Sequence, residues 1–119
     1  MENKSKNKSY VLRFREVNRD IFNSIKKGKK KIETRAATVK YRNIKVGDSV
    51  ILVCGGDRFT KIVVSTRIFS GVPSMLKMYS AKEINPNVKT SEELLKIYFS
   101  FPGYREKLKK FGLITIELR

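Results

Sequence analysis

The most constraining feature of the sequence is an alternating apolar segment, Leu113–Leu118, that no other predicted strand adjoins along the chain. A strand without a sequence neighbour must pair with strands that come much earlier, so the chain has to fold through long-range β pairing. The earlier segments with strand-like alternation or β-branched runs are Tyr10–Arg15, Lys30–Ala37, Ser49–Cys54 and Arg58–Phe69. Together they predict a mixed α/β, mainly β fold: a small barrel of about five to six strands with flanking short helices.

Helical periodicity is confined to one segment after the first strand and to the last third of the chain. Asn18 is expected to cap the first helix, with Val17 and Phe22 as its hydrophobic staple, and Gly28 is expected to end it. The later helices are expected around Met75–Tyr79, at Leu94–Phe99 after a cap at Thr90 or Ser91, and at Tyr104–Phe111. The helices therefore flank a β core.

The charge balance favours a polyanionic partner. The 119 residues carry 27 Lys and Arg against 11 Asp and Glu, a formal net charge of +16. A field of this sign attracts nucleic acid and speeds its encounter with the protein. Charge alone also fits a solvated basic surface with no such partner. We expect RNA or a nucleotide-like ligand.

Residue types that are scarce or missing narrow the chemistry. Histidine is absent and Cys54 is the single cysteine, which excludes an internal disulfide, an intrachain zinc site and catalytic triads built on histidine. No apolar run approaches the roughly 20 residues that span a bilayer. Residues 1–9 are rich in Lys, Asn and Ser and are predicted to be a disordered basic tail, not a signal peptide. We expect a cytoplasmic, single-domain monomer with no metal, no cofactor and no membrane contact.

A short motif after the first helix carries the chemistry. Gly28, Lys30, Glu33 and Arg35 fit the pattern G-x-K-x-x-E-x-R. Strand alternation places Glu33 and Arg35 on one side and Thr34 on the other. Lys30 is expected to contact phosphate or to act as an amine of lowered pKa, Glu33 to accept a proton or hold a base edge, and Arg35 to bind phosphate. A structural ion pair between Glu33 and Arg35 is the alternative.

Other basic residues extend this candidate site. Arg13 and Arg15 lie on the first predicted strand, and Lys40, Tyr41 and Arg42 lie in a polar loop after the motif. A basic loop with one aromatic ring suits single-stranded RNA, whose bases stack and whose phosphates pair with cations. A solvated loop without a ligand is the alternative.

The motif, the amphipathic helix before it and the Ile-Lys-Val-Gly-Asp turn at 44–48 together resemble the ASCH domain family, a branch of the PUA-like superfamily. The resemblance covers residues 10–119 and includes the late Glu-Glu-Leu-Leu helix, the Lys-Lys-Phe-Gly turn and the closing strand. It implies a PUA-like β-barrel with flanking helices. It also implies a cleft beside the motif strand that receives RNA or a nucleotide-like ligand.

The resemblance leaves catalysis open. Certain small relatives are amidohydrolases of acetylated cytidine that use a Lys, a Thr and a Glu, and others are described as ribonucleases. Lys30 matches the Lys, Glu33 stands at the Thr position, and Glu83 is the nearest candidate for the Glu. We predict an RNA-binding protein. The alternatives are a small hydrolase of modified nucleosides or RNA, with Lys30 and Glu33 as its catalytic residues, and a protein-interaction adaptor.

Overall fold

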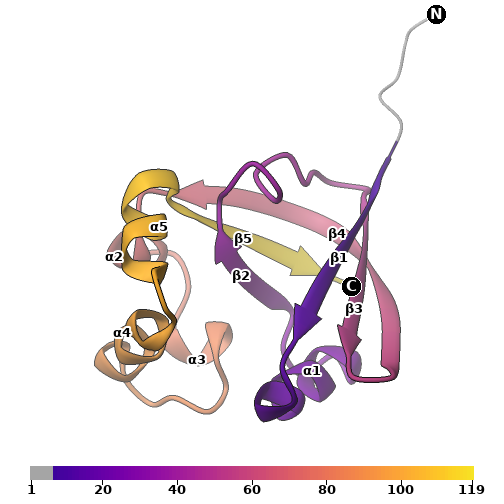
Figure 1. The fold of residues 1–119 in the computed structure, drawn as a ribbon, viewed down its shortest axis with the longest axis horizontal. Coiled ribbons are helices and arrows are strands. Elements are labelled where there is room, and N and C mark those ends of the chain that lie inside the picture. The colour runs from indigo at the N-terminus through magenta and orange to yellow at the C-terminus, as the bar shows by residue number, and fades with distance from the viewer. Residues whose placement is uncertain (1–6) are drawn as a thin grey trace, which may run out of the picture.

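The computed structural model describes residues 7–119, which form a curled sheet with helices packed around it (Figure 1). In chain order the elements are β1 (Ser9–Phe14), the 3-10 helix η1 (Glu16–Asn18), α1 (Arg19–Lys26), β2 (Ile32–Ala36), β3 (Ser49–Cys54), β4 (Asp57–Phe69), α2 (Val72–Met75), α3 (Ala81–Ile84), α4 (Ser91–Ser100), α5 (Tyr104–Phe111) and β5 (Leu113–Leu118). All of the strands predicted from alternation are present. The short helix α3 was not predicted.

The strands form one sheet in the order β1-β3-β4-β5-β2. β1 and β3 are parallel, and the other neighbours are antiparallel. The closing strand β5 lies between β4 and β2, which confirms the long-range pairing expected of it. β1 and β2 are left at the two edges, so the sheet is a half-barrel with an opening between them (Figure 1). The predicted mixed α/β, mainly β class is confirmed.

The long strand β4 makes the sheet curl. Its first half, Asp57–Ile62, pairs with β3, and its second half pairs with β5 from Val63 onward. The register with β5 shifts between Val63 and Ser65. An extra residue in one strand bends it and increases its twist. β4 therefore carries the sheet from its β1–β3 side round to its β5–β2 side.

Apolar side chains form two cores that meet at β5. The barrel core packs α1 against the sheet and includes the fully buried Phe22 and Leu12. The helical core packs α2 to α5 against the sheet, with Met75 and Leu94 at its centre and Ile32 contributed by β2. β2 is thus an edge strand with helices beside it.

The predicted disordered tail at 1–9 extends too far. Residues 1–6 lie outside the described residues, but Lys8 and Ser9 join the sheet. The main-chain amide of Lys8 donates to Asp48 Oδ1 over 2.9 Å, and the Lys8 carbonyl accepts from Ser49 over 2.9 Å. β1 then begins at Ser9. The bond from Ser49 continues the parallel β1–β3 ladder by one residue, and the Asp48 carboxylate holds the Lys8 amide, so the strand region begins earlier than composition indicates.

The predicted start of the first helix is also wrong in detail. Val17 is 74% exposed, so it forms no hydrophobic staple with Phe22. Asn18 makes no side-chain capping bond. The tight turn η1 precedes α1 and leaves Val17 facing solvent. Thr90, in contrast, caps α4 through a capping box with Glu93, as expected. No helix within residues 7–119 is long and apolar enough to cross a membrane.

Candidate functional site

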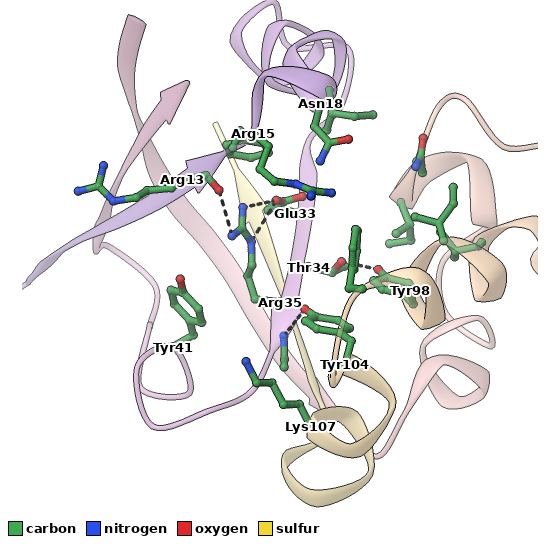
Figure 2. A pocket seen from close by; sticks show the side chains of 18 of the residues that line it. Arg13, Arg15, Asn18, Glu33, Thr34, Arg35, Tyr41, Tyr98, Tyr104 and Lys107 are labelled. Carbon is green, nitrogen blue, oxygen red and sulfur yellow. Dashed lines mark hydrogen bonds and ion pairs between the residues drawn. The ribbon is translucent and has the colours of Figure 1, made fainter. Parts of the chain in front are cut away.

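The opening of the half-barrel holds a pocket of about 500 Å³ between the edge strands and the helices α4 and α5 (Figure 2). Its charged lining residues are Arg13, Arg15, Lys30, Glu33, Arg35, Lys40 and Lys107, its aromatic ones are Phe14, Tyr41, Tyr98, Phe101 and Tyr104, and its other polar ones are Asn18, Thr34, Thr38 and Asn85. Six cationic residues therefore face one carboxylate. The volume lies within the range of small-molecule pockets.

The edge position of β2 exposes its main chain to this pocket. The Leu118 amide donates to the Lys31 carbonyl over 2.7 Å, which fixes the hydrogen-bonded pairs of the β2–β5 ladder. Antiparallel ladders alternate such pairs with pairs whose main-chain groups point away. The residues whose groups point to the free edge are Ile32, Thr34 and Ala36. Side chains on both faces of β2 therefore border one pocket.

One wall is an ion cluster of Lys30, Glu33 and Arg35. Arg35 Nη2 lies 2.9 Å and its Nε 3.3 Å from Glu33 Oε2. Lys30 Nζ lies 3.5 Å from Glu33 Oε1. Arg35 also spans the half-barrel opening, where its Nη1 lies 3.4 Å from the Arg13 carbonyl and its guanidinium lies 5.0 Å from the Phe14 ring centre. The predicted ion pair exists and links the two edge strands.

Charge within the ion cluster fixes the state of its carboxylate. Burial by itself raises the pKa of Glu33, but Arg35 and Lys30 outweigh burial and hold that pKa below its ordinary value. Burial lowers the pKa of the Lys30 amine, and Glu33 opposes this only in part. Burial also lowers the pKa of Arg35, but Glu33 outweighs it and the pKa is raised. Glu33 is therefore ionised at neutral pH and a weak proton acceptor.

Lys30 is held by the protein itself. Its ammonium donates to the main-chain carbonyl of Ile84 in α3 over 2.5 Å and to the carbonyl of Ile32. The residue is only 3% exposed. The lysine expected to contact phosphate is thus a buried one that joins β2 to the helical core. Its donors are directed to protein acceptors.

A second wall, opposite the ion cluster, carries neutral hydroxyl groups. The hydroxyls of Thr34 and Tyr98 are hydrogen-bonded to each other, and both residues are buried. The Ala36 amide, at the free edge of β2, donates to the Tyr104 hydroxyl over 2.7 Å. Thr34 does point away from Glu33, as alternation predicts, yet it borders the same pocket (Figure 2). We call Thr34, Tyr98 and Tyr104 the hydroxyl wall.

The rim of the pocket is basic. The exposed rim cations are Arg13, Arg15, Lys40 and Lys107. Arg15 lies 5.9 Å from the Phe101 ring centre and Lys40 lies 5.3 Å from that of Tyr41. Within residues 7–119 none of the four forms an ion pair with a carboxylate, so their charge is available to a ligand.

Two predicted site residues lie elsewhere. Arg42 is absent from the pocket lining, because its guanidinium turns back to the Ala37 carbonyl, 3.3 Å away. Glu83 is also outside the lining and is used in the capping box of α3, where its carboxylate accepts from the Ser80 amide over 2.9 Å. The other predicted residues, from Arg13 to Tyr41, all border the pocket.

The helical side of the site was missed from the sequence. The sequence analysis does not name Tyr98, Phe101, Tyr104 or Lys107 as site residues, yet all four line the pocket. Their spacing along α4 and α5 fits core packing equally well, and Tyr98 does belong to the helical core. One feature of the sequence could have indicated them: Tyr98 and Tyr104 place hydroxyl groups on otherwise apolar helix faces. A buried hydroxyl needs a hydrogen-bond partner, so such a tyrosine points to a polar neighbour.

Ionic and aromatic groups, not a metal cluster, dominate the site. Residues 7–119 contain no group of three or more His, Cys, Asp or Glu side chains placed to hold a metal ion. Glu33, the carboxylate among the described residues that line the pocket, is paired with Lys30 and Arg35. The arrangement can bind a group that combines negative charge with a planar or aromatic part.

Fold and site together define a class: small mixed α/β proteins with a five-stranded half-barrel and a basic, aromatic pocket at its opening. The chain is similar to a solved structure described as hypothetical protein PH0355, with 33% identity and a TM-score of 0.80 over 93% of this chain and 97% of that one. It is also similar to protein PF0455 from Pyrococcus furiosus, with 30% identity and a TM-score of 0.71 over 93% of this chain and 96% of that one. The chain belongs to the family of these two proteins. No family model and no curated protein matches it.

Proposed function

We propose that this protein is an ASCH-type, PUA-like domain that binds RNA or a nucleotide-like ligand in the pocket, as a monomer in the cytoplasm. The observation that carries the proposal is the lining of the pocket, where six cations and five aromatic rings surround a single neutralised carboxylate. Phosphates pair with cations and bases stack on aromatic rings, so both halves of a nucleotide have partners there.

The distribution of charge supports phosphate binding at the rim. Glu33 forms ion pairs with Lys30 and Arg35. Its negative charge is therefore not available to neutralise the rim cations. Those cations are exposed and without carboxylate partners in the described part of the chain. Phosphates left in solvent contact at the rim would pair with them at little desolvation cost, whereas a phosphate deep in the pocket would meet the Glu33 carboxylate.

A hydrolase is the second candidate, because Lys30, Glu33 and Thr34 line one pocket. The geometry supports it less well. The Thr34 hydroxyl is bonded to Tyr98, whose pKa is raised by burial, so Tyr98 keeps its own proton at neutral pH and cannot serve as the base. Glu33 is held as an ionised partner of two cations. Turnover of acylated nucleosides or short RNAs that is lost in Glu33→Gln, under conditions where unfolding curves show the variant still folded, would establish the hydrolase instead.

Salt-dependent binding of single-stranded RNA tests the proposal. Four rim cations predict that the logarithm of the association constant falls with the logarithm of salt concentration with a slope of about −3. Fluorescence anisotropy of a labelled oligonucleotide measures it. Arg13→Ala and Lys107→Ala should each reduce the slope by about 0.7. Lys77→Ala, at an exposed lysine outside the pocket lining, is the matched control. A slope near zero, or equal losses in all three variants, contradicts binding at this pocket.

A further inference from the structure

The hydroxyl wall carries more hydroxyl protons than there are acceptor atoms for them among the described residues. Its three groups are the hydroxyls of Thr34, Tyr98 and Tyr104, and each carries one proton and can also accept. Figure 2 shows the tyrosine rings of α4 and α5 with their hydroxyls directed at β2. A count of donors and acceptors at these groups identifies which protons remain for a ligand.

Tyr104 has a free donor. Its oxygen accepts from the Ala36 amide over 2.7 Å, and in that bond the main chain supplies the proton. The tyrosine proton must therefore point elsewhere. Within residues 7–119 no acceptor lies in hydrogen-bond reach of it. Burial raises the pKa of Tyr104, so the proton stays on the oxygen at neutral pH.

The Thr34–Tyr98 pair has a second free donor. The two hydroxyls bring two protons to one contact, and only one proton can lie between the two oxygens. The other has no acceptor among the described residues. Thr34 is 9% and Tyr98 5% exposed, so this is a buried polar hydrogen without a partner. Such a group is costly unless a water or a ligand atom accepts from it.

The two free donors belong to neighbouring groups of the hydroxyl wall. The Tyr98 and Tyr104 rings are parallel within 3°, with their centres 6.0 Å apart. Their partners Thr34 and Ala36 are two residues apart on one strand, a separation of about 6.6 Å. The protein therefore presents two donors from one wall of the pocket, opposite the ion cluster, whose Glu33 carboxylate only accepts.

We infer that the hydroxyl wall reads an unpaired nucleobase through its carbonyl oxygens or ring nitrogens, while the phosphates stay at the rim cations. This inference rests on the proposed function. A phosphate is the less suitable occupant, since the wall is neutral, two of its three residues are buried, and the ion cluster opposite it contains the Glu33 carboxylate. A base is planar and neutral and carries acceptors on its pairing edge, which is accessible only when the base is unpaired.

The test compares ligands with and without the base. The probes are a uridine tetranucleotide and an oligonucleotide of the same length whose residues are abasic, and the variants are Tyr104→Phe and Tyr98→Phe. Each variant removes one hydroxyl and keeps the ring. Each should weaken binding of the uridine oligonucleotide about 3- to 10-fold, the value of one hydrogen bond, and change abasic binding less than 2-fold. Tyr79→Phe, outside the pocket lining, is the matched control and should change neither.

Titration of uridine monophosphate and ribose 5-phosphate with the same proteins distinguishes a free nucleotide from an RNA strand as the source of the base. Unfolding curves of each variant ensure that the comparison uses folded protein. The inference is overturned if both oligonucleotides lose affinity equally, or if neither variant loses affinity for uridine. In those cases salt-dependent binding by the wild type still supports the proposed function. No binding of any probe by the wild type contradicts both.

Discussion

The two walls of the pocket differ in how many of their charged and hydrogen-bonding groups have partners within the protein. In the ion cluster, Glu33 is bonded to Lys30 and Arg35, and Lys30 also has two main-chain acceptors. In the hydroxyl wall, two of three protons have no acceptor among residues 7–119. The charged wall is thus a closed network that supports the structure, while the neutral wall is the one with hydrogen-bonding capacity left for a ligand.

The sequence motif suggests that Lys30, Glu33 and Arg35 bind the ligand, whereas the structure gives them mainly a role in stability. Lys30, Glu33 and Arg35 are its most conspicuous residues, yet their main contacts hold β2 to β1 and to α3. A buried charged network is sensitive to the removal of any one member. Changes in the ion cluster should therefore act mainly on stability, and changes in the hydroxyl wall and at the rim mainly on binding.

The largest expected effect is the loss of stability in Glu33→Gln. The substitution keeps the size of the side chain but leaves the buried charges of Lys30 and Arg35 without a counter-ion. We expect the free energy of unfolding to fall by about 3–5 kcal/mol, measured by urea denaturation. Glu92→Gln, at an exposed residue of α4, is the control and should change it by less than about 0.5 kcal/mol. A loss below about 1 kcal/mol in Glu33→Gln would show that the cluster is not a structural network.

A smaller loss of stability is expected when the pH is lowered. Protonation of Glu33 tests the same ion cluster without a substitution. The pKa of Glu33 is lower in the folded protein than its ordinary value of 4.5. Between the two values the unfolded chain binds more protons, so stability rises with pH. The contribution of Glu33 is fully present above pH 4.5 and is lost as pH falls through the folded pKa.

Urea denaturation of the wild type and of Glu33→Gln at several values between about pH 6 and pH 3 isolates this contribution. The wild type should lose more stability on acidification than the variant, because only the wild type has the Glu33 carboxyl to protonate. Parallel curves for the two proteins would place the pKa of Glu33 at its unfolded value, which the ion cluster does not allow.

Local patterns predicted the charged wall, and long-range geometry produced the neutral one. Alternation was enough to identify β2 and to place Glu33 beside Arg35, and the isolated strand β5 was enough to require a sheet built by distant pairing. The partners Thr34 and Tyr98, however, are separated by 64 positions. Their contact depends on α4 packing against the free edge of β2, and no spacing rule within one element encodes that packing.

The same limit explains the errors at single residues. Arg42 was predicted to bind a ligand because it lies in a basic loop, but its guanidinium donates to the main-chain carbonyl of Ala37 instead. Lys30 was expected to contact phosphate, but the chain turns it inward, where three acceptors surround it. Side-chain type determined what each residue is able to bind, and the fold determined which partner was within reach.

The smallest expected change in stability, and the sharpest test of the contrast between the walls, is that of Tyr98→Phe. The variant loses the hydrogen bond to Thr34 but leaves no unpaired charge, and the ring still packs in the helical core. Its unfolding free energy should fall by about 0.5–1.5 kcal/mol, well below the loss in Glu33→Gln. Thr34→Val breaks the same bond from the other side and should cost a similar amount. If either change destabilised the protein as much as Glu33→Gln, the hydroxyl wall would be as structural as the ion cluster, and the assignment of stability to one wall and recognition to the other would fail.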